Sequence, residues 1–433
     1  MKKLKAYTNV LKLRVNMALK RAAIHNYPVT AIIEPTSFCN LHCPACPTGL
    51  RLDLRPTVAI KEELFKAAID EIGDYIFQLN MYNWGEPLLH KQTPELIAYA
   101  KAKEISISLS TNLSIKLTDD YIERLVRSGL DTLVVSLDGV TEETYSKYRR
   151  NGNLALVREN VRRIHETKER LGAQTPEVVW QFLVFRHNEH EIDTVRSVYQ
   201  AWGADSVSIK GAQMPIEEYG EGFEPSTMPE YNLYHPEHHS VRTAAKLMQS
   251  SRSCTWLYGA FVLNPNGKVS PCCAVPAEKH DFSEYKQADG FWAAWNSDKF
   301  RRARQMFTRS SSAPKLTAQR LIQIRKRLDG MNAGAADSLA DDKLICHKCP
   351  IPDLQHYIDP VINQTSGDLL SAVWHGRRFG ARAQAALYYL LMGAPNLRVN
   401  ARIGARKLSA YLRPSAGQPE MTNDKRRREA DHA

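Results

Sequence analysis

Residues 38–46 read FCNLHCPAC, and this short stretch decides what fold and chemistry to expect of the chain. Its three cysteines, Cys39, Cys43 and Cys46, are separated by three and then two residues. Three thiolates on one short loop can hold three irons of a [4Fe–4S] cube and leave the fourth iron open. A small molecule can bind at an open iron and take up an electron there. The stretch therefore predicts a redox cluster with a vacant coordination position.

Residues 29–211 alternate between strand-like and helix-like segments. The predicted strands are residues 29–34, 75–82, 105–110, 132–137, 178–184 and 206–210. Six βα units in a row predict an α/β fold whose parallel sheet curls into a partial (β/α)6 TIM-like barrel, short of the eight units of a closed one. Such folds carry their chemistry at the carboxyl ends of the strands, and the cysteine loop follows the first strand.

Four more cysteines form a second group: Cys254, Cys272, Cys346 and Cys349, the last two as a CxxC pair. Residues 264–268 read NPNGK, a hairpin signal that would bring the first two together. Four cysteines that include a CxxC pair suit a structural zinc ion or an iron–sulfur cluster, and the residues alone leave both open.

Three turns at strand ends complete the pattern. Residues 83–87 read NWGEP after the second strand, residues 110–112 read STN at the end of the third, and residues 136–139 read SLDG at the end of the fourth. Together with the cysteine loop they resemble the radical S-adenosylmethionine (SAM) superfamily, although Trp84 replaces the first glycine of that family's Gly-Gly-Glu-Pro turn. The later cysteines resemble the SPASM or twitch extension that follows the barrel in many of its members.

The resemblance implies a role for each group of residues. The first three cysteines would hold a SAM-binding [4Fe–4S] cluster, which passes an electron to SAM and so generates a 5′-deoxyadenosyl radical that takes a hydrogen atom from the substrate. Glu86 would complement the SAM ammonium, and Arg149 or Arg150 would pair with the SAM carboxylate or an acid of the site. The SAM-binding residues implied are Trp84, Gly85, Glu86, Pro87, Ser110, Thr111, Asn112, Ser136, Asp138 and Arg149.

The same resemblance implies that Cys254, Cys272, Cys346 and Cys349 hold one auxiliary [4Fe–4S] cluster, which accepts an electron from the substrate radical and makes the net reaction an oxidation. The eighth cysteine, Cys273, could donate a hydrogen atom to a substrate radical, or it could be a packed small hydrophobe.

Positive charge gathers at the two ends of the chain. Residues 1–22 hold seven Lys or Arg and no acid, and residues 376–433 hold twelve against four Asp or Glu. Of the net charge of +11, the ends therefore carry +15 and the body −4, so a nucleic-acid partner is not expected. The first basic segment, with Leu4 and Leu19 at near-helical spacing, could contact an anionic membrane, hold an acidic or lipid-linked substrate, or pack on the barrel as a solvated helix.

These observations predict five segments. They are a basic amphipathic helix (1–25), the radical SAM barrel (26–215), a connecting or lid segment (216–253), an auxiliary cluster domain (254–355, with an insertion at 310–342) and a basic helical extension (356–433, with a tail after 414 expected to be disordered). We find no apolar run of the ~20 residues that span a bilayer and no secretory signal. Clustered cysteines and iron–sulfur chemistry predict a reducing, cytoplasmic compartment.

The function expected is that of a radical SAM oxidoreductase, served by an electron donor such as flavodoxin or ferredoxin. No peptide-recognition segment is evident before the barrel, which favours a small or carbohydrate-like substrate. One alternative is a peptide- or protein-modifying or maturation enzyme. Another, of a different class, is a non-catalytic binding protein stabilised by zinc.

Overall fold

The computed structural model describes residues 2–212, 223–232, 235 and 254–306. Four of the predicted features lie wholly or largely outside these residues: most of the connecting segment, the insertion at 310–342, the C-terminal extension, and the pair Cys346 and Cys349. The statements below concern the described residues.

Six parallel strands form the body of the sheet, as predicted. They are β1 (Thr30–Ile33), β2 (Gln78–Asn80), β3 (Ser106–Thr111), β4 (Thr132–Ser136), β5 (Glu177–Val184) and β6 (Ser206–Gly211). Each lies within the segment predicted for it to within one residue at either end, although β2 is much shorter than its segment. Apolar side chains of the strands face the core, as the alternation of buried and half-buried residues along β5 illustrates.

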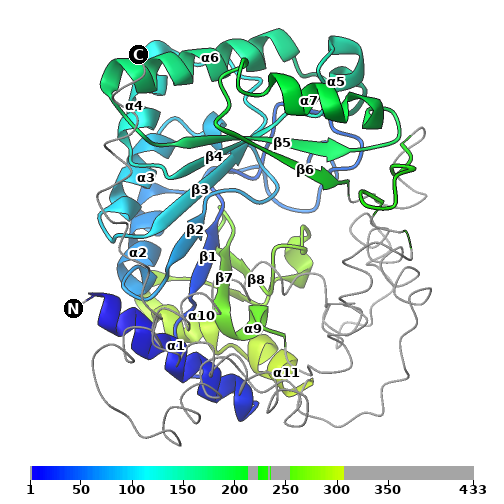
Figure 1. Cartoon of the computed structure of the whole chain (residues 1–433). Coiled ribbons are helices and arrows are strands. Elements are labelled where there is room, and N and C mark those ends of the chain that lie inside the picture. The colour runs from blue at the N-terminus through cyan, green and yellow to red at the C-terminus, as the bar shows by residue number, and fades with distance from the viewer. Residues whose placement is uncertain (1, 213–222, 233–234, 236–253, 307–433) are drawn as a thin grey trace, which may run out of the picture. The chain divides into compact units, whose positions relative to one another are not determined.

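Helices follow most of these strands and line the outside of the curved sheet (Figure 1). They are α2 (Glu62–Ile72), α3 (Thr93–Lys101), α4 (Asp119–Arg127), α5 (Glu142–Tyr148), α6 (Leu154–Leu171) and α7 (Ile192–Val198). Local signals set several of their ends; for example, the Thr118 side chain accepts a hydrogen bond from the Tyr121 amide and caps α4. This arrangement confirms the α/β class and the open parallel sheet expected of a partial barrel.

The strands after residue 254 extend the same sheet, which the sequence did not predict. Strands β7 (Ala260–Leu263), β8 (Lys268–Ser270) and β9 (Ser283–Glu284) give the order β6-β5-β4-β3-β2-β1-β7-β8-β9. Strand β7 pairs in parallel with β1, with Thr30 opposite Ala260, whereas β8 and β9 are antiparallel. The predicted hairpin joins β7 to β8, and Gly267 supplies its positive φ of 83°. Cys254, Cys272 and Cys273 are thereby carried on or beside an extension of the barrel sheet.

Short helices complete this region. They are α9 (Trp256–Gly259), α10 (Phe291–Trp295) and α11 (Asp298–Met306). Trp295 and Phe300 are fully buried in the main core beside β7, so the region shares its core with the barrel.

The basic N-terminal helix, α1 (Lys2–Ala18), packs against the segment that leads into β1. Its buried face carries Val10 and Leu13, and Asn9 exchanges hydrogen bonds with the backbone of Tyr27. Leu4 and Leu19 point outward and are 69% and 60% exposed. One face of α1 is therefore packed on the barrel, as one of the three alternatives from the sequence expected. Leu4 and Leu19, noted there for their near-helical spacing, lie on a different, exposed face. None of the described helices combines the length and apolar character needed to cross a membrane.

Candidate active site

The cysteine loop leaves the carboxyl end of β1 and is closed at its base. Before the cysteines, the Ser37 amide donates to Val58 O (3.0 Å), and the Ile60 amide donates to Pro35 O (2.8 Å). A β-bridge between Thr36 and Ala59 completes this ladder. The loop is thus anchored on both sides at the end of the sheet where parallel α/β folds place their chemistry.

The three thiols of the loop lie in one small apolar cluster beside Tyr148 and Phe185. Cys43 is buried, Cys39 and Cys46 are half-buried, and none forms a disulfide. Burial raises the pKa of Cys39 to about 12 and that of Cys43 to about 11. Thiolates at such a place need positive charge to form, as bound iron would provide.

The donor set of the loop fits an iron–sulfur cluster. Among the described residues, no three side chains of His, Cys, Asp or Glu are arranged to hold one metal ion. Three thiols on one short loop are the donor type and number that would hold three irons of a [4Fe–4S] cluster. Hydrogen-bond donors already face the sulfurs, because the Asn112 amide group lies 3.5 Å from Cys39 Sγ and Arg149 Nη1 lies 3.9 Å from Cys43 Sγ.

The turn after β2 is held against this loop by a carboxylate that the sequence analysis missed. Glu34, buried at the end of β1, accepts the amides of Trp84 (2.5 Å) and Gly85 (2.6 Å) on one oxygen. Gly85 is required here, since a Cβ on it would lie 1.9 Å from Thr36 O. The available signal was an acidic residue directly after an apolar strand and directly before the cysteine loop.

The Glu86 carboxylate is already engaged within the protein. It accepts the Leu88 amide (3.1 Å), the Thr111 hydroxyl (2.7 Å) and the Asn112 amide (2.7 Å), so it ties the turn to the end of β3. Burial raises its pKa to about 7. Pro87 begins a short 3-10 helix, Pro87–Leu89, directly behind it. A direct contact of Glu86 with the SAM ammonium stays a prediction.

Asn112 connects the end of β3 to the cysteine loop. Its side-chain nitrogen reaches Asn40 Oδ1 (3.0 Å) as well as Cys39 Sγ. Of the other two residues predicted here, Thr111 is buried against Glu86, whereas Ser110 is half-buried on the opposite face of the strand. Asn112 is therefore the member of the three that the structure places beside the cysteines.

The end of β4 carries a buried ion pair that reaches the same loop. Asp138 is fully buried and accepts Arg149 Nε (2.6 Å) and the Leu183 amide (2.7 Å). Burial raises the pKa of Asp138, and Arg149 opposes that shift. Ser136, also buried, lies at the end of the strand. Arg150 is exposed, so the structure favours Arg149 of the two candidate arginines.

On the auxiliary side, the structure describes Cys254, which is buried, and Cys272 and Cys273, which are half-buried. The amide orientation of Asn83 that satisfies both of its neighbours lets it donate to Cys273 O and accept from Trp84 Nε1, each at 3.2 Å. Asn83, the first residue of the turn after β2, thus contacts the backbone of Cys273, and Trp84 orients it by donating to its side-chain oxygen. No motif in the sequence predicts this contact.

Comparison with known families matches two parts of the chain. A model of the radical SAM superfamily matches residues 33–195, and a model of the SPASM iron–sulfur cluster-binding domain matches residues 254–318. The chain is a radical SAM protein with a SPASM domain. Its cofactors are accordingly SAM and [4Fe–4S] clusters. These matches run from the end of β1 to α7 and from Cys254 past α11.

Several curated proteins are similar to this radical SAM protein over part of their length. The PqqA peptide cyclase of Granulibacter bethesdensis is 26% identical over 187 residues, which are 43% of this chain and 48% of that protein. The Fe-coproporphyrin III synthase of Methanosarcina barkeri is 33% identical over 114 residues, 26% of this chain and 28% of that protein. The match thus spans about half the length of the first relative and less of the second.

Solved structures show the same fold at low identity. Streptococcus suis SuiB bound to SAM matches with a TM-score of 0.51 and 13% identity, over 72% of this chain and 77% of SuiB. The anSMEcpe structure with bound SAM matches with a TM-score of 0.50 and 15% identity, over 78% of this chain and 100% of anSMEcpe. They support the fold of the radical SAM protein described above.

The buried Glu34 predicts a dependence of stability on pH. Burial raises its pKa to about 7, whereas it ionises near 4.5 when unfolded. The folded protein therefore holds more protons between these values, and the free energy of unfolding should fall as pH rises from 5 to 8, by on the order of 2 kcal/mol for this group. The raised pKa of Glu86 should also make the free energy of unfolding fall as pH rises.

In the Glu34→Gln variant the free energy of unfolding should fall less steeply with pH, because the side chain no longer ionises. The variant should still fold, since its amide oxygen can accept both amides of the turn. The measurement is urea unfolding of the metal-free protein at pH 5, 6, 7 and 8. Glu63→Gln, on the exposed face of α2, is the matched control and should keep the full fall. Equal slopes for the two variants would contradict the prediction.

Proposed function

We propose that this radical SAM protein modifies a peptide substrate by an oxidative reaction. The observation that carries the proposal is the nature of its relatives, which include PqqA peptide cyclases, one of them matching 57% of this chain and 68% of its own length at 22% identity. SuiB, whose fold matches over 72% of this chain, has also been solved with its precursor peptide SuiA. A peptide thus replaces the small or carbohydrate-like substrate first expected from the sequence.

Under this proposal the residues of the loop and of the strand ends would have different roles. Cys39, Cys43 and Cys46 would hold the SAM-binding cluster. Asn112 and Arg149 face the sulfur atoms of the first two of these cysteines. The backbone of the turn held by Glu34 would receive the amino group of SAM, with the polar strand ends Ser110 and Ser136 nearby in the sheet order. Burial of the loop among Leu41, Tyr148 and Phe185 would exclude water from the reacting atoms.

The auxiliary cluster would be held by Cys254 and Cys272 together with Cys346 and Cys349, which lie outside the described residues. When bound, the clusters and SAM supply a radical that removes a hydrogen atom from the substrate and an acceptor for the electron left behind. An external donor such as flavodoxin or ferredoxin would keep the first cluster reduced, in a reducing, cytoplasmic compartment. The basic ends could place the enzyme at an anionic membrane surface.

The test is anaerobic purification and reconstitution, followed by metal analysis and turnover. About eight irons per chain and no stoichiometric zinc are expected for two [4Fe–4S] clusters, whereas zinc without iron would point to the non-catalytic binding protein. With dithionite and SAM, peptides encoded beside the gene should raise the yield of 5′-deoxyadenosine and lose a pair of hydrogen atoms by mass. Turnover of aminocyclitols or sugars, with every such peptide inert, would overturn the peptide proposal.

A further inference from the structure

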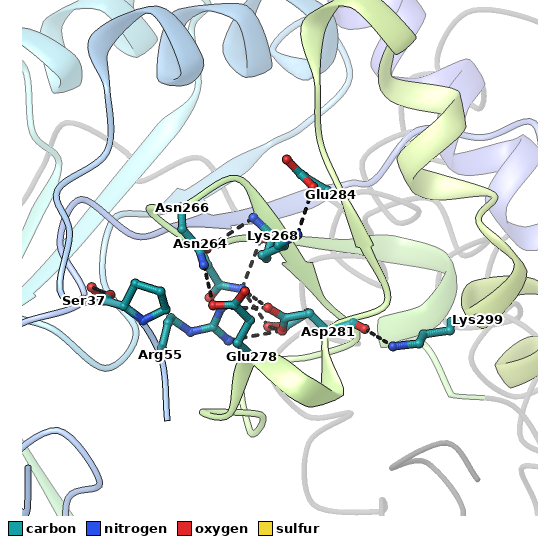
Figure 2. Close-up of polar contacts among 11 residues, drawn as sticks. Ser37, Arg55, Asn264, Asn266, Lys268, Glu278, Asp281, Glu284 and Lys299 are labelled. Carbon is teal, nitrogen blue, oxygen red and sulfur yellow. Dashed lines mark hydrogen bonds and ion pairs between the residues drawn. The ribbon is translucent and has the colours of Figure 1, made fainter. Parts of the chain in front are cut away.

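A buried ion pair joins the cysteine loop to the auxiliary side of the molecule. Arg55, in the stretch that closes the cysteine loop, meets Asp281 through two contacts, Nη1 to Oδ2 at 2.7 Å and Nη2 to Oδ1 at 3.1 Å. Their side chains are only 6% and 4% exposed, although the residues are 226 positions apart in the chain. Figure 2 shows Arg55 reaching Asp281 from one side, with Lys299 on the other.

On the auxiliary side, Asp281 holds the segment that leads to Cys272. The Ser270 hydroxyl, two residues before that cysteine, donates to Asp281 Oδ1 (2.6 Å). Asn264, at the end of β7, donates to the Ser270 hydroxyl (2.8 Å), and Lys299 donates to the backbone oxygen of Asp281 (2.7 Å). Every acceptor atom of Asp281 is therefore used, and the hairpin β7–β8 is fixed around it.

On the barrel side, Arg55 is fixed to the residues that precede Cys39. The Ser37 hydroxyl donates to Pro56 O (2.6 Å) and accepts the Val58 amide (2.9 Å). The backbone of Leu54 adds a second tie, since its oxygen accepts the Glu278 amide (2.9 Å). A continuous set of contacts thus runs from two residues before Cys39 to two residues before Cys272.

Stability alone is a weak reason for such a pair. Replacing a buried ion pair by apolar side chains of similar volume is often neutral or stabilising, because the two charges lose their hydration. Apolar packing does not reproduce the geometry of such a pair. A guanidinium that meets a carboxylate through two parallel contacts fixes both the distance and the relative orientation of the two segments that carry them.

We propose that Arg55 and Asp281 are positioning residues that fix the loop carrying Cys39 relative to the segment carrying Cys272. The inference rests on the assignment of these cysteines as cluster ligands under the proposed function. The pair would hold the two clusters at one separation and one orientation, which matters because electron transfer slows steeply with distance. Neither residue touches the reacting atoms in this proposal.

The first test uses the full-length protein without metal. Arg55→Lys keeps the charge but loses the two-point contact, and should speed amide exchange roughly tenfold in residues 35–60 and 264–285 together, as loss of one charged hydrogen bond predicts. Exchange in β3 and β4 should not change. Arg51→Lys, an exposed arginine of the same loop, is the matched control. Faster exchange on one side only would overturn the coupling between the two segments.

The second test separates positioning from stability in the reconstituted protein. The double variant Arg55→Leu/Asp281→Leu, measured below the melting temperature of both proteins, should still assemble its clusters but broaden the distribution of cluster–cluster distances measured by pulsed dipolar EPR of the reduced protein. A double-leucine variant with the wild-type distribution would overturn the proposal. If no clusters assemble, iron analysis will show that the proposed function has failed, while amide exchange still decides the coupling.

Discussion

The Cys43→Ser variant should lose reductive cleavage of SAM altogether. Cys43 is the most buried of the three loop cysteines, and it is the one that Arg149 faces. A serine hydroxyl ionises far less readily than a thiol, so the buried loop would offer two ligands in place of three. We expect iron to fall from about eight to about four per chain, with the auxiliary cluster retained.

Dithionite-dependent formation of 5′-deoxyadenosine measures this loss, and Cys273→Ser is the matched control. Cys273 is half-buried beside the core and is not assigned as a ligand, so its variant should keep its full iron content. A Cys43→Ser protein with wild-type iron and wild-type SAM cleavage would contradict the assignment of the loop. Loss of iron in the Cys273 variant instead would identify a ligand that the present assignment omits.

Local sequence predicted the parts of the site that lie within a few residues of each other. The gaps among Cys39, Cys43 and Cys46 and the polar residues that end β3 and β4 are written in short stretches, and the parallel sheet brings those ends together. These motifs can be recognised without knowing the order of the strands in the sheet. For this reason the loop, the turn and the strand ends all lie where the sequence placed them.

The contacts that could not be predicted join segments far apart in the chain. The pairing of β7 with β1 sets Thr30 opposite Ala260, and either strand alone reads only as a short apolar run. Likewise, the turn sequence predicted a carboxylate at the site, that of Glu86. The groups that bind this carboxylate, Thr111 and Asn112, come from the end of another strand and occupy its oxygens. Residue type was predictable here, whereas the partner depended on the tertiary structure.

The Arg149→Met variant should be strongly destabilised even without metal. Asp138 is fully buried, and with Arg149 gone the Leu183 amide (2.7 Å) would be the one donor left to its carboxylate among the residues that the structure describes. Breaking a buried ion pair on one side leaves an uncompensated charge, which costs about 3–5 kcal/mol of unfolding free energy. Methionine fills similar volume, so the loss reflects charge more than packing. Urea unfolding of the metal-free protein measures it.

The pH dependence of that loss identifies its cause. Burial raises the pKa of Asp138 and Arg149 opposes the shift, so removing the arginine lets the folded protein hold the proton of Asp138 to higher pH. Protonation removes the buried charge, and the deficit of Arg149→Met should therefore be smaller at pH 5 than at pH 8. Arg150→Met is the control, because that side chain is exposed and should change stability by less than about 0.5 kcal/mol. Adding Asp138→Asn to Arg149→Met should recover part of the loss and flatten its pH dependence, whereas equal losses for the two methionine variants would rule out the ion pair as the cause.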